Sequence, residues 1–255
     1  MESLIPNLML VGLHSETYWV RLAVQRVYGS LFQTQMRDPH LSVTAALGLS
    51  EAGELSDHLY KLASVFRFRH MLTDELGTQL VKNLTYLLRH ADPSCLPRLF
   101  SRCSFLARKM MLNVSVAKDK IAHVLLFFQV ALHLFESQAE GQQDNACTRA
   151  VLTPVLELVY RIYTDEQYAE SRARELSSEI VDYLSAGLDK AFFITTYNSV
   201  KAGIQAKRVE RRRQQKVLLA TDQGAKLKEK KRARKAEKKR EKKRAKIMHY
   251  ELRKN

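Results

Sequence analysis

The side chains of this chain that could do chemistry are cations gathered near one end of it. Residues 201–255 hold 23 Lys and Arg against 6 Asp and Glu, a formal charge of +17, whereas residues 1–200 carry −2. Such a density of like charge opposes its own compaction and is tolerated where a polyanion neutralises it. Because ammonium and guanidinium groups bind phosphate oxygens, the segment predicts binding to a nucleic-acid backbone. We call residues 201–255 the tail.

The candidate binding side chains of the tail fall into two blocks of Lys and Arg. No aromatic residue lies between Lys201 and His249, so base stacking is unavailable and contacts to the backbone without sequence readout are expected. Residues 226–246 hold good helix formers and neither Gly nor Pro, which predicts a partly helical segment that folds further when phosphates neutralise it. A nuclear or nucleolar localisation signal and a merely solvated tail are the alternatives. The candidates are Lys207, Arg208, Arg211, Arg212, Arg213 and Lys216 in the first block, and Lys228, Lys230, Lys231, Arg232, Arg234, Lys235, Lys238, Lys239, Arg240, Lys242, Lys243, Arg244 and Lys246 in the second.

Motifs for catalysis are missing from the sequence. It holds no GxxxxGK[ST], GxGxxG, HExxH or GxSxG, and no Cys and His residues at metal-binding spacing. Asp119 and His123 are one helical turn apart, but no nucleophile accompanies them, so they indicate a contact on a helix surface. The three cysteines, an odd number without a CxxC pair, favour reduced thiols in an intracellular protein. We therefore expect no enzymatic activity, no cofactor, no metal site and no small-molecule substrate.

Two apolar stretches are too short to cross a membrane. Residues 4–13 contain Pro6 and lack the cationic start of a secretory signal, and residues 121–135 are interrupted by His123, Gln129 and His133. The first stretch predicts the end of a packed helix and an apolar end of the body, and the second predicts a buried helix. No membrane association is expected.

The elements that must position the cations are helices. Residues 1–200, the predicted body, are rich in Leu, Ala, Val, Lys, Glu and Arg, and they show helical rather than alternating apolar spacing. The fold class is all-α, and a pitch of about forty residues per helix pair predicts a HEAT/armadillo-like helical solenoid, with an irregular helical bundle as the alternative. The helices are expected over residues 55–68, 74–89, 96–112, 116–135, 148–163 and 166–187 and from residue 188 into the tail, with a surface loop over residues 136–145.

The first predicted helix carries apolar residues on two sides. Val20, Val24, Val27 and Leu31 recur at helical spacing, and Trp19 begins a second stripe with Leu22 and Ala23. Arg21, Gln25 and Arg26 lie between the two stripes. This pattern predicts a helix inside a stack, with both apolar stripes covered by neighbouring helices.

Three aromatic residues precede the tail and are candidates for docking it. Phe192, Phe193 and Tyr197 stand at the start of the last predicted helix, just before the first block of cations. We expect them to pack that helix onto the body and to set the direction in which the cations leave it.

Three segments of the sequence resemble the motifs of one family. Residues 18–23 (YWVRLA), followed by 27–29 (VYG) and 31–32 (LF), look like a WVRLA…VFG.LF signature. Residues 76–84 (LGTQLVKNL) resemble an LGxQxVKNL segment, which is the more specific match, and residues 193–213 follow an aromatic-then-basic approach to a lysine-rich end. The family that these segments resemble is the small-subunit processome component 20 homologues, which are very large U-three-snoRNA-associated HEAT-repeat scaffolds. Family members are many times longer, so the sequence is expected to correspond to a C-terminal piece.

The resemblance implies a non-enzymatic scaffold of small ribosomal subunit biogenesis in the nucleus and nucleolus. It implies precursor ribosomal RNA and protein components of the small-subunit processome as partners, with the helical body docking assembly factors and the tail binding the rRNA backbone. The chain departs from the family at residues 89–97, where an acidic insertion is missing, and at residues 221–226, which match only loosely. The alternative is a freestanding helical adaptor whose tail is read only as a localisation signal.

Overall fold

Every regular element among the described residues is a helix. The computed structural model describes residues 11–37, 47, 49, 52–67, 74–111, 114–138, 145–221, 224, 227, 231, 234 and 235, and no strand occurs within them. The expected all-α class is therefore confirmed. The elements are α2 (Tyr18–Arg37), α4 (Ala52–Ala63), η1 (Ser64–Arg67), α5 (Asp74–Leu88), η2 (Pro93–Cys95), α6 (Leu96–Met111), α7 (Val114–Gln138), α8 (Asn145–Tyr163), η3 (Glu166–Tyr168), α9 (Arg172–Gly187) and α10 (Lys190–Thr221).

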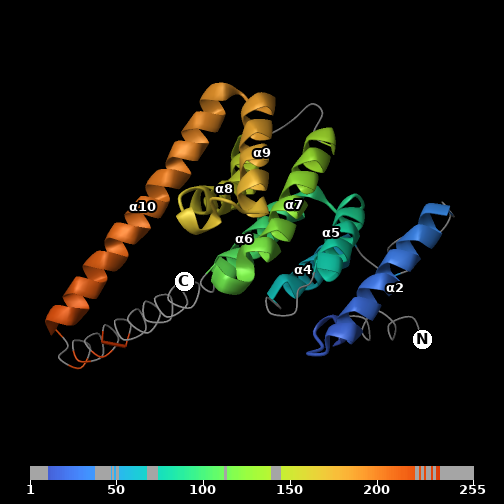
Figure 1. Ribbon diagram of the computed structural model, residues 1–255. Helices are drawn as coiled ribbons and strands as arrows, with labels where there is room; N and C mark the ends of the chain where they lie inside the picture. The colour runs from blue at the N-terminus through green and yellow to red at the C-terminus, as the bar shows by residue number, and fades with distance from the viewer. Residues whose placement is uncertain are drawn as a thin grey trace, which may run out of the picture. The chain divides into compact units, whose positions relative to one another are not determined.

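The chain divides into two units, Met1–Lys201 and Ala202–Asn255, and α10 contributes to both. In the first unit α4 packs on α5, α6 on α7 and α8 on α9. Each pair also contacts the next, through α4, α6 and α8 in one layer and through α5, α7 and α9 in the other (Figure 1). Helix α2 adds to the second layer by packing on α5. This stacking of pairs is the arrangement in which amphipathic helices bury their faces against neighbours. Its assignment to the HEAT/armadillo class stays a prediction.

Aromatic and aliphatic side chains fill the space between the two layers. Phe100 on α6 lies 4.8 Å from Phe128 and 6.1 Å from Phe127 on α7, measured between ring centroids. All three rings are fully buried. Aromatic pairs at these separations add about 0.5–1.5 kcal/mol each to the gain from apolar burial. The predicted buried helix over residues 121–135 is thus the central part of α7.

One predicted helix is interrupted near its start. Residues 166–187 form η3 and then α9, because the carboxylate of Asp165 accepts the backbone N–H of Gln167 at 3.1 Å and closes a short turn. The ring of Tyr168 is fully buried, and the Ser171 hydroxyl donates to the Tyr168 carbonyl at 2.8 Å. A polar cap and a buried aromatic in this turn outweigh the continuous helical pattern.

The face that α2 buries differs from the two predicted stripes. Arg21, Gln25, Tyr28 and Phe32 are buried together with Leu22 of the second predicted stripe, whereas Val20 and Val27 are 41% and 47% exposed. Trp19, on the second predicted stripe, is 71% exposed. The expectation that both apolar stripes are covered is therefore wrong. Of residues 4–13, only 11–13 are described, with Val11 exposed and Leu13 buried.

Hydrogen bonds fix the buried face of α2. The Asn83 side-chain amide on α5 donates to the backbone carbonyl of Gln25 at 2.8 Å and to its side-chain oxygen at 2.7 Å. The Gln79 amide in turn donates to Asn83 at 3.0 Å. A buried amide without partners costs about 1–3 kcal/mol, so these bonds select the rotation of α2 over one that would bury its valines.

A glycine permits the close approach of α7 to α5. A Cβ atom added to Gly77 would lie 2.6 Å from ring atoms of His123, whereas a Cβ atom on Gly203 would meet nothing within 4 Å. Gly77→Ala should destabilise the fold by about 1–3 kcal/mol, the usual cost of overpacking. Gly203→Ala is the matched control and should be neutral or stabilising by up to about 1 kcal/mol, through helix propensity alone. Urea unfolding measures both, and equal midpoints for the two variants would contradict the close contact.

Acid should weaken the fold through His58. This ring is buried and shares a 2.6 Å hydrogen bond with the Tyr28 hydroxyl, and burial, followed by the nearby charge of Lys61, lowers its pKa from 6.5 to about 4. Below about pH 6.5 the imidazole of His58 is protonated in the unfolded chain, whereas in the folded chain it stays neutral down to about pH 4. The free energy of unfolding should therefore fall by up to about 1.4 kcal/mol for each pH unit as the pH is lowered from 6.5 to 4. His58→Gln keeps a partner for Tyr28 but cannot titrate. Its free energy of unfolding should depend less on pH over that window, and parallel curves for the two proteins would contradict the assignment.

Candidate nucleic-acid interface

The first block of tail cations lies on a continuous, solvent-exposed stretch of α10. Arg208, Arg212 and Lys216 recur every four residues, so they form one row along the helix, and Lys207 and Arg211 form a second row beside it. The six side chains of the block, all exposed, are Lys207, Arg208, Arg211, Arg212, Arg213 and Lys216. A helix thus presents these cations at fixed spacing.

The charges of this block are not neutralised within the described part of the chain. Glu210, its one acidic neighbour on the helix, accepts a hydrogen bond from the Gln214 amide at 2.8 Å, and no ion pair of the described residues includes a cation of the block. Exposed cations without carboxylate partners keep their full attraction for phosphate. The arrangement can bind a polyanion and offers nothing for bond-making chemistry.

Only three cations of the second block lie among the described residues. Lys231, Arg234 and Lys235 are helical and exposed. Their role, like that of the first block, stays a prediction. The other ten predicted residues of this block lie outside the described residues: Lys228, Lys230, Arg232, Lys238, Lys239, Arg240, Lys242, Lys243, Arg244 and Lys246.

The predicted docking aromatics are half-buried and contact α8 within the first unit. The Arg149 guanidinium lies 5.5 Å from the ring centroid of Phe192. Tyr197 lies 6.2 Å from Tyr160 in an edge-on arrangement and 6.0 Å from Phe193 in a stacked one. Burial raises the pKa of the Tyr197 hydroxyl, which keeps it neutral. How these contacts direct the tail is untested.

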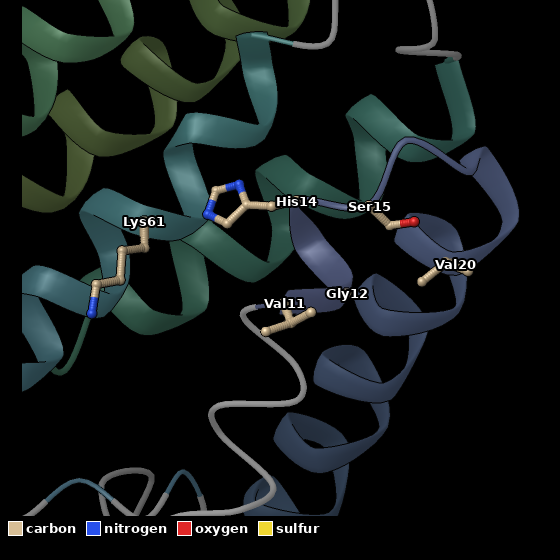
Figure 2. Close-up of a pocket in the computed structure, with 6 residues that line it drawn as sticks. All are labelled: Val11, Gly12, His14, Ser15, Val20 and Lys61. Atoms are coloured by element: carbon tan, nitrogen blue, oxygen red, sulfur yellow. The ribbon is translucent and has the colours of Figure 1, made fainter.

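The hollow near α2 holds no set of reactive groups. It has a volume of about 680 Å³ and is lined mostly by apolar atoms, with His14 and Lys61 on one side (Figure 2). The Ser15 hydroxyl there accepts the backbone N–H of Thr17 at 3.1 Å. Burial and the charge of Arg67 lower the pKa of His14, so the ring is neutral. The neutral imidazole of His14, the ammonium group of Lys61 and the hydrogen-bonded hydroxyl of Ser15 do not form a catalytic set.

A second hollow contains the histidine that the sequence paired with Asp119. His123 lines a cavity of about 360 Å³ with Thr78 and Arg172, and its Nε2 lies 4.0 Å from the Asp74 carboxylate. The side chain of Asp119 is not among those described. Arg172 is engaged by Glu175 at 2.9 Å and by Glu179 at 3.4 Å. Beside His123 the cavity offers the Thr78 hydroxyl and the Asp74 carboxylate, and we assign no reaction to this group of side chains.

The described residues hold neither a metal-binding cluster nor a membrane-spanning helix. No three His, Cys, Asp or Glu side chains come close enough together to hold a metal ion. No described helix is both long and apolar enough to cross a bilayer.

Fold and site together define an all-helical protein with an exposed cationic helix that suits a polyanion. Over 217 residues the chain is 24% identical to the U3 small nucleolar RNA-associated protein 20 of Schizosaccharomyces pombe. The similarity covers 76% of this chain and 8% of that much longer protein, which its name associates with a small nucleolar RNA. No protein-family profile and no solved structure matches the chain.

The two most distinctive segments of the family resemblance meet in the structure. Gly29 comes from the first segment and Gln25 lies between its parts, whereas Gln79 and Asn83 come from the second. A Cβ atom on Gly29 would lie 2.6 Å from the Gln79 amide, and Asn83 donates to Gln25. These positions build the contact between α2 and α5. They do not point to a ligand, so the shared motifs report the packing of the fold.

Sequence reasoning missed one surface that carries both charge and aromatic rings. Arg98, Arg102, Phe105 and Lys109 lie on one stripe of α6. Their spacing of four, three and four residues was visible in the sequence. The low net charge of residues 1–200 concealed it.

Removing a docking aromatic should weaken the first unit. Phe193→Ala is expected to cost about 1–2 kcal/mol, less than the roughly 3–5 kcal/mol of a fully buried aromatic, because its ring is half-buried. Ile194→Ala is the matched control, since Ile194 is 47% exposed, and it should cost clearly less. Thermal unfolding measures both. Equal melting temperatures for Phe193→Ala and the wild type would mean that this ring does not hold α10.

Proposed function

We propose that this chain is a non-enzymatic scaffold of small ribosomal subunit biogenesis that contacts precursor ribosomal RNA through the cations of its tail. The observation that carries the proposal is the exposed block from Lys207 to Lys216 on α10, six cations without carboxylate partners among the described residues. The similarity to a protein associated with U3 small nucleolar RNA supports RNA as the polyanion. We expect the tail to contact phosphates and not to read bases, because no aromatic residue lies between Lys201 and His249.

The stacked helices supply the other half of a scaffold. Paired helices in two layers present extended surfaces on which protein components of the small-subunit processome can dock. The same proposal places the protein in the nucleus and nucleolus, where precursor ribosomal RNA is processed. No cofactor, small molecule or membrane takes part.

The experiment has to distinguish RNA binding from nuclear localisation. Arg211, Arg212 and Arg213 are replaced by Gln in the full chain, and a heterologous nuclear localisation signal is attached. Crosslinking to ribosomal RNA is then followed separately from nuclear entry. Loss of crosslinking with nuclear entry intact supports the scaffold. Full crosslinking by the variant would favour the adaptor whose tail is only a localisation signal.

Binding should depend steeply on salt and little on sequence. If about 6 phosphates of single-stranded RNA are neutralised, the logarithm of the affinity should fall against the logarithm of salt with a slope of about −4. Replacing Arg211, Arg212 and Arg213 by Gln should flatten that slope by about 2 and weaken every RNA alike. Replacing the same three by Lys keeps the charge and should leave the slope unchanged.

The measurement is a salt titration with two RNAs of equal length and different sequence. A strong preference for one RNA that survives in the Gln variant, or an affinity that ignores salt, would contradict backbone binding by the tail.

A further inference from the structure

Three cations and one aromatic residue form a row along the exposed face of α6. Arg98, Arg102, Phe105 and Lys109 form the row, in which Phe105 is 40% exposed. The opposite face of the helix is buried, so the row faces away from the core. The buried residues of α6 are Leu96, Leu99, Phe100, Cys103, Ser104, Leu106, Ala107 and Met110.

The cations of the row lie over aromatic faces. The Arg98 guanidinium carbon is 4.6 Å from the ring centroid of Tyr60 on α4, and that of Arg102 is 5.5 Å from it. The Lys109 ammonium nitrogen is 4.6 Å from the centroid of Phe105. A cation held over a ring is fixed in place but keeps its charge. We call these five residues the stacked row.

Much of the positive charge here is not neutralised. Arg98 is 3.4 Å from Asp57, but both side chains are more than half exposed, so the pair is weak. Arg102 and Lys109 belong to no ion pair of the described residues, and the buried Nε of Arg102 has no hydrogen-bond acceptor among them. The row is therefore a positive surface on a part of the chain that is close to neutral overall.

A neighbouring cluster adds to that surface. The single carboxylate of Glu157 on α8 accepts from Arg108 at 2.8 Å and from Arg161 at 3.1 Å, so two guanidinium groups share one negative charge. Arg108 lies on α6 beside Lys109. The cluster keeps a net positive charge next to the stacked row.

We propose that the stacked row binds single-stranded RNA, with bases stacking on the exposed part of the Phe105 ring and on the guanidinium planes, and with phosphates on the cations. Exposed aromatic rings and guanidinium planes are recurring means of holding unpaired bases, whereas the bases of duplex RNA are stacked inside the helix. From Arg98 to Lys109 the row is about 16 Å long, at about 1.5 Å per residue, which suits a few nucleotides. An acidic protein segment would match the charge but would leave the exposed part of the Phe105 ring without a stacking partner. This surface goes beyond the proposed function, which assigns RNA contact to the tail, and does not depend on it.

The experiment uses the full chain and two RNAs that differ only in their bases. An oligouridine and an abasic RNA of equal length carry the same phosphates, so the tail should bind both equally. The stacked row should add a preference of at least about fivefold for oligouridine, the lower end of what one base on an aromatic ring contributes. Phe105→Leu should abolish most of that preference while leaving the abasic affinity unchanged, and Phe105→Trp should restore it. Replacing Arg211, Arg212 and Arg213 by Gln should weaken both RNAs alike and keep the preference.

The chain offers a matched control for an exposed aromatic under a cation. Tyr163 is 49% exposed, and the Arg174 guanidinium lies 4.1 Å from its ring centroid. That guanidinium is already bonded to the Tyr163 backbone carbonyl at 2.5 Å. Tyr163→Leu should therefore leave the preference for oligouridine intact. If it lowers the preference as much as Phe105→Leu does, the effect is not specific to the stacked row and the proposal is wrong.

Three further results would overturn the proposal. The first is equal affinity of the wild type for oligouridine and abasic RNA. The second is displacement of oligouridine by duplex RNA as effectively as by single-stranded RNA. The third is binding of polyglutamate that requires Phe105, together with binding of oligouridine that does not require Phe105. The last result would make the row a site for an acidic protein segment.

Thermal unfolding shows whether Phe105→Leu folds. If it does not, Arg102→Gln serves instead and should lower the affinity for oligouridine at unchanged melting temperature; an unchanged affinity would overturn the proposal.

Discussion

The amide of Asn83 is the constraint on which the arrangement of α2 depends. It is buried between two helices and donates to both oxygens of Gln25, and the Asn83 side-chain oxygen accepts from Gln79 on its own helix. Apolar contacts are non-directional and tolerate several rotations of a helix. Buried amides do not, because each unmade bond leaves a desolvated polar group. One rotation of α2 is thereby selected, and it turns Trp19, Val20 and Val27 outward.

The long helices were predictable because packing and local pattern agree in them. Helices α5 and α6 fall within a residue of their predicted ranges at both ends, since caps, apolar spacing and boundaries all pointed the same way. Prediction failed where a polar group decided the outcome. The hydrogen bonds of Gln25 bury a face of α2 that differs from the two predicted apolar stripes. The cap at Asp165 divides the helix predicted over residues 166–187 into η3 and α9. Which polar side chain finds a buried partner depends on contacts some fifty residues away, and a periodicity does not contain that information.

The candidate sites were likewise predictable where the local sequence decides them and not where contacts between helices do. The cations of α10 could be identified from charge alone, since their exposure follows from their density. Helix α6 holds four cations and no acidic residue, but this charge does not by itself show which cations lie over aromatic rings. Recognition of the stacked row required knowing that Tyr60 on α4 comes under the guanidinium groups of Arg98 and Arg102 on α6.

The layered stacking has a consequence for how the chain reaches its structure. Side-chain bonds between neighbouring helices of one layer join residues 49, 50 and 58 positions apart, as between Arg108 and Glu157, Gln129 and Glu179, and Asn83 and Gln25. Each helix therefore contacts helices of an adjacent pair, and the loop that has to close is similar in length at every step. A two-layer stack can grow outward from any formed pair. The central pair of α6 and α7, which holds the Phe100, Phe127 and Phe128 cluster, is the natural nucleus for that growth.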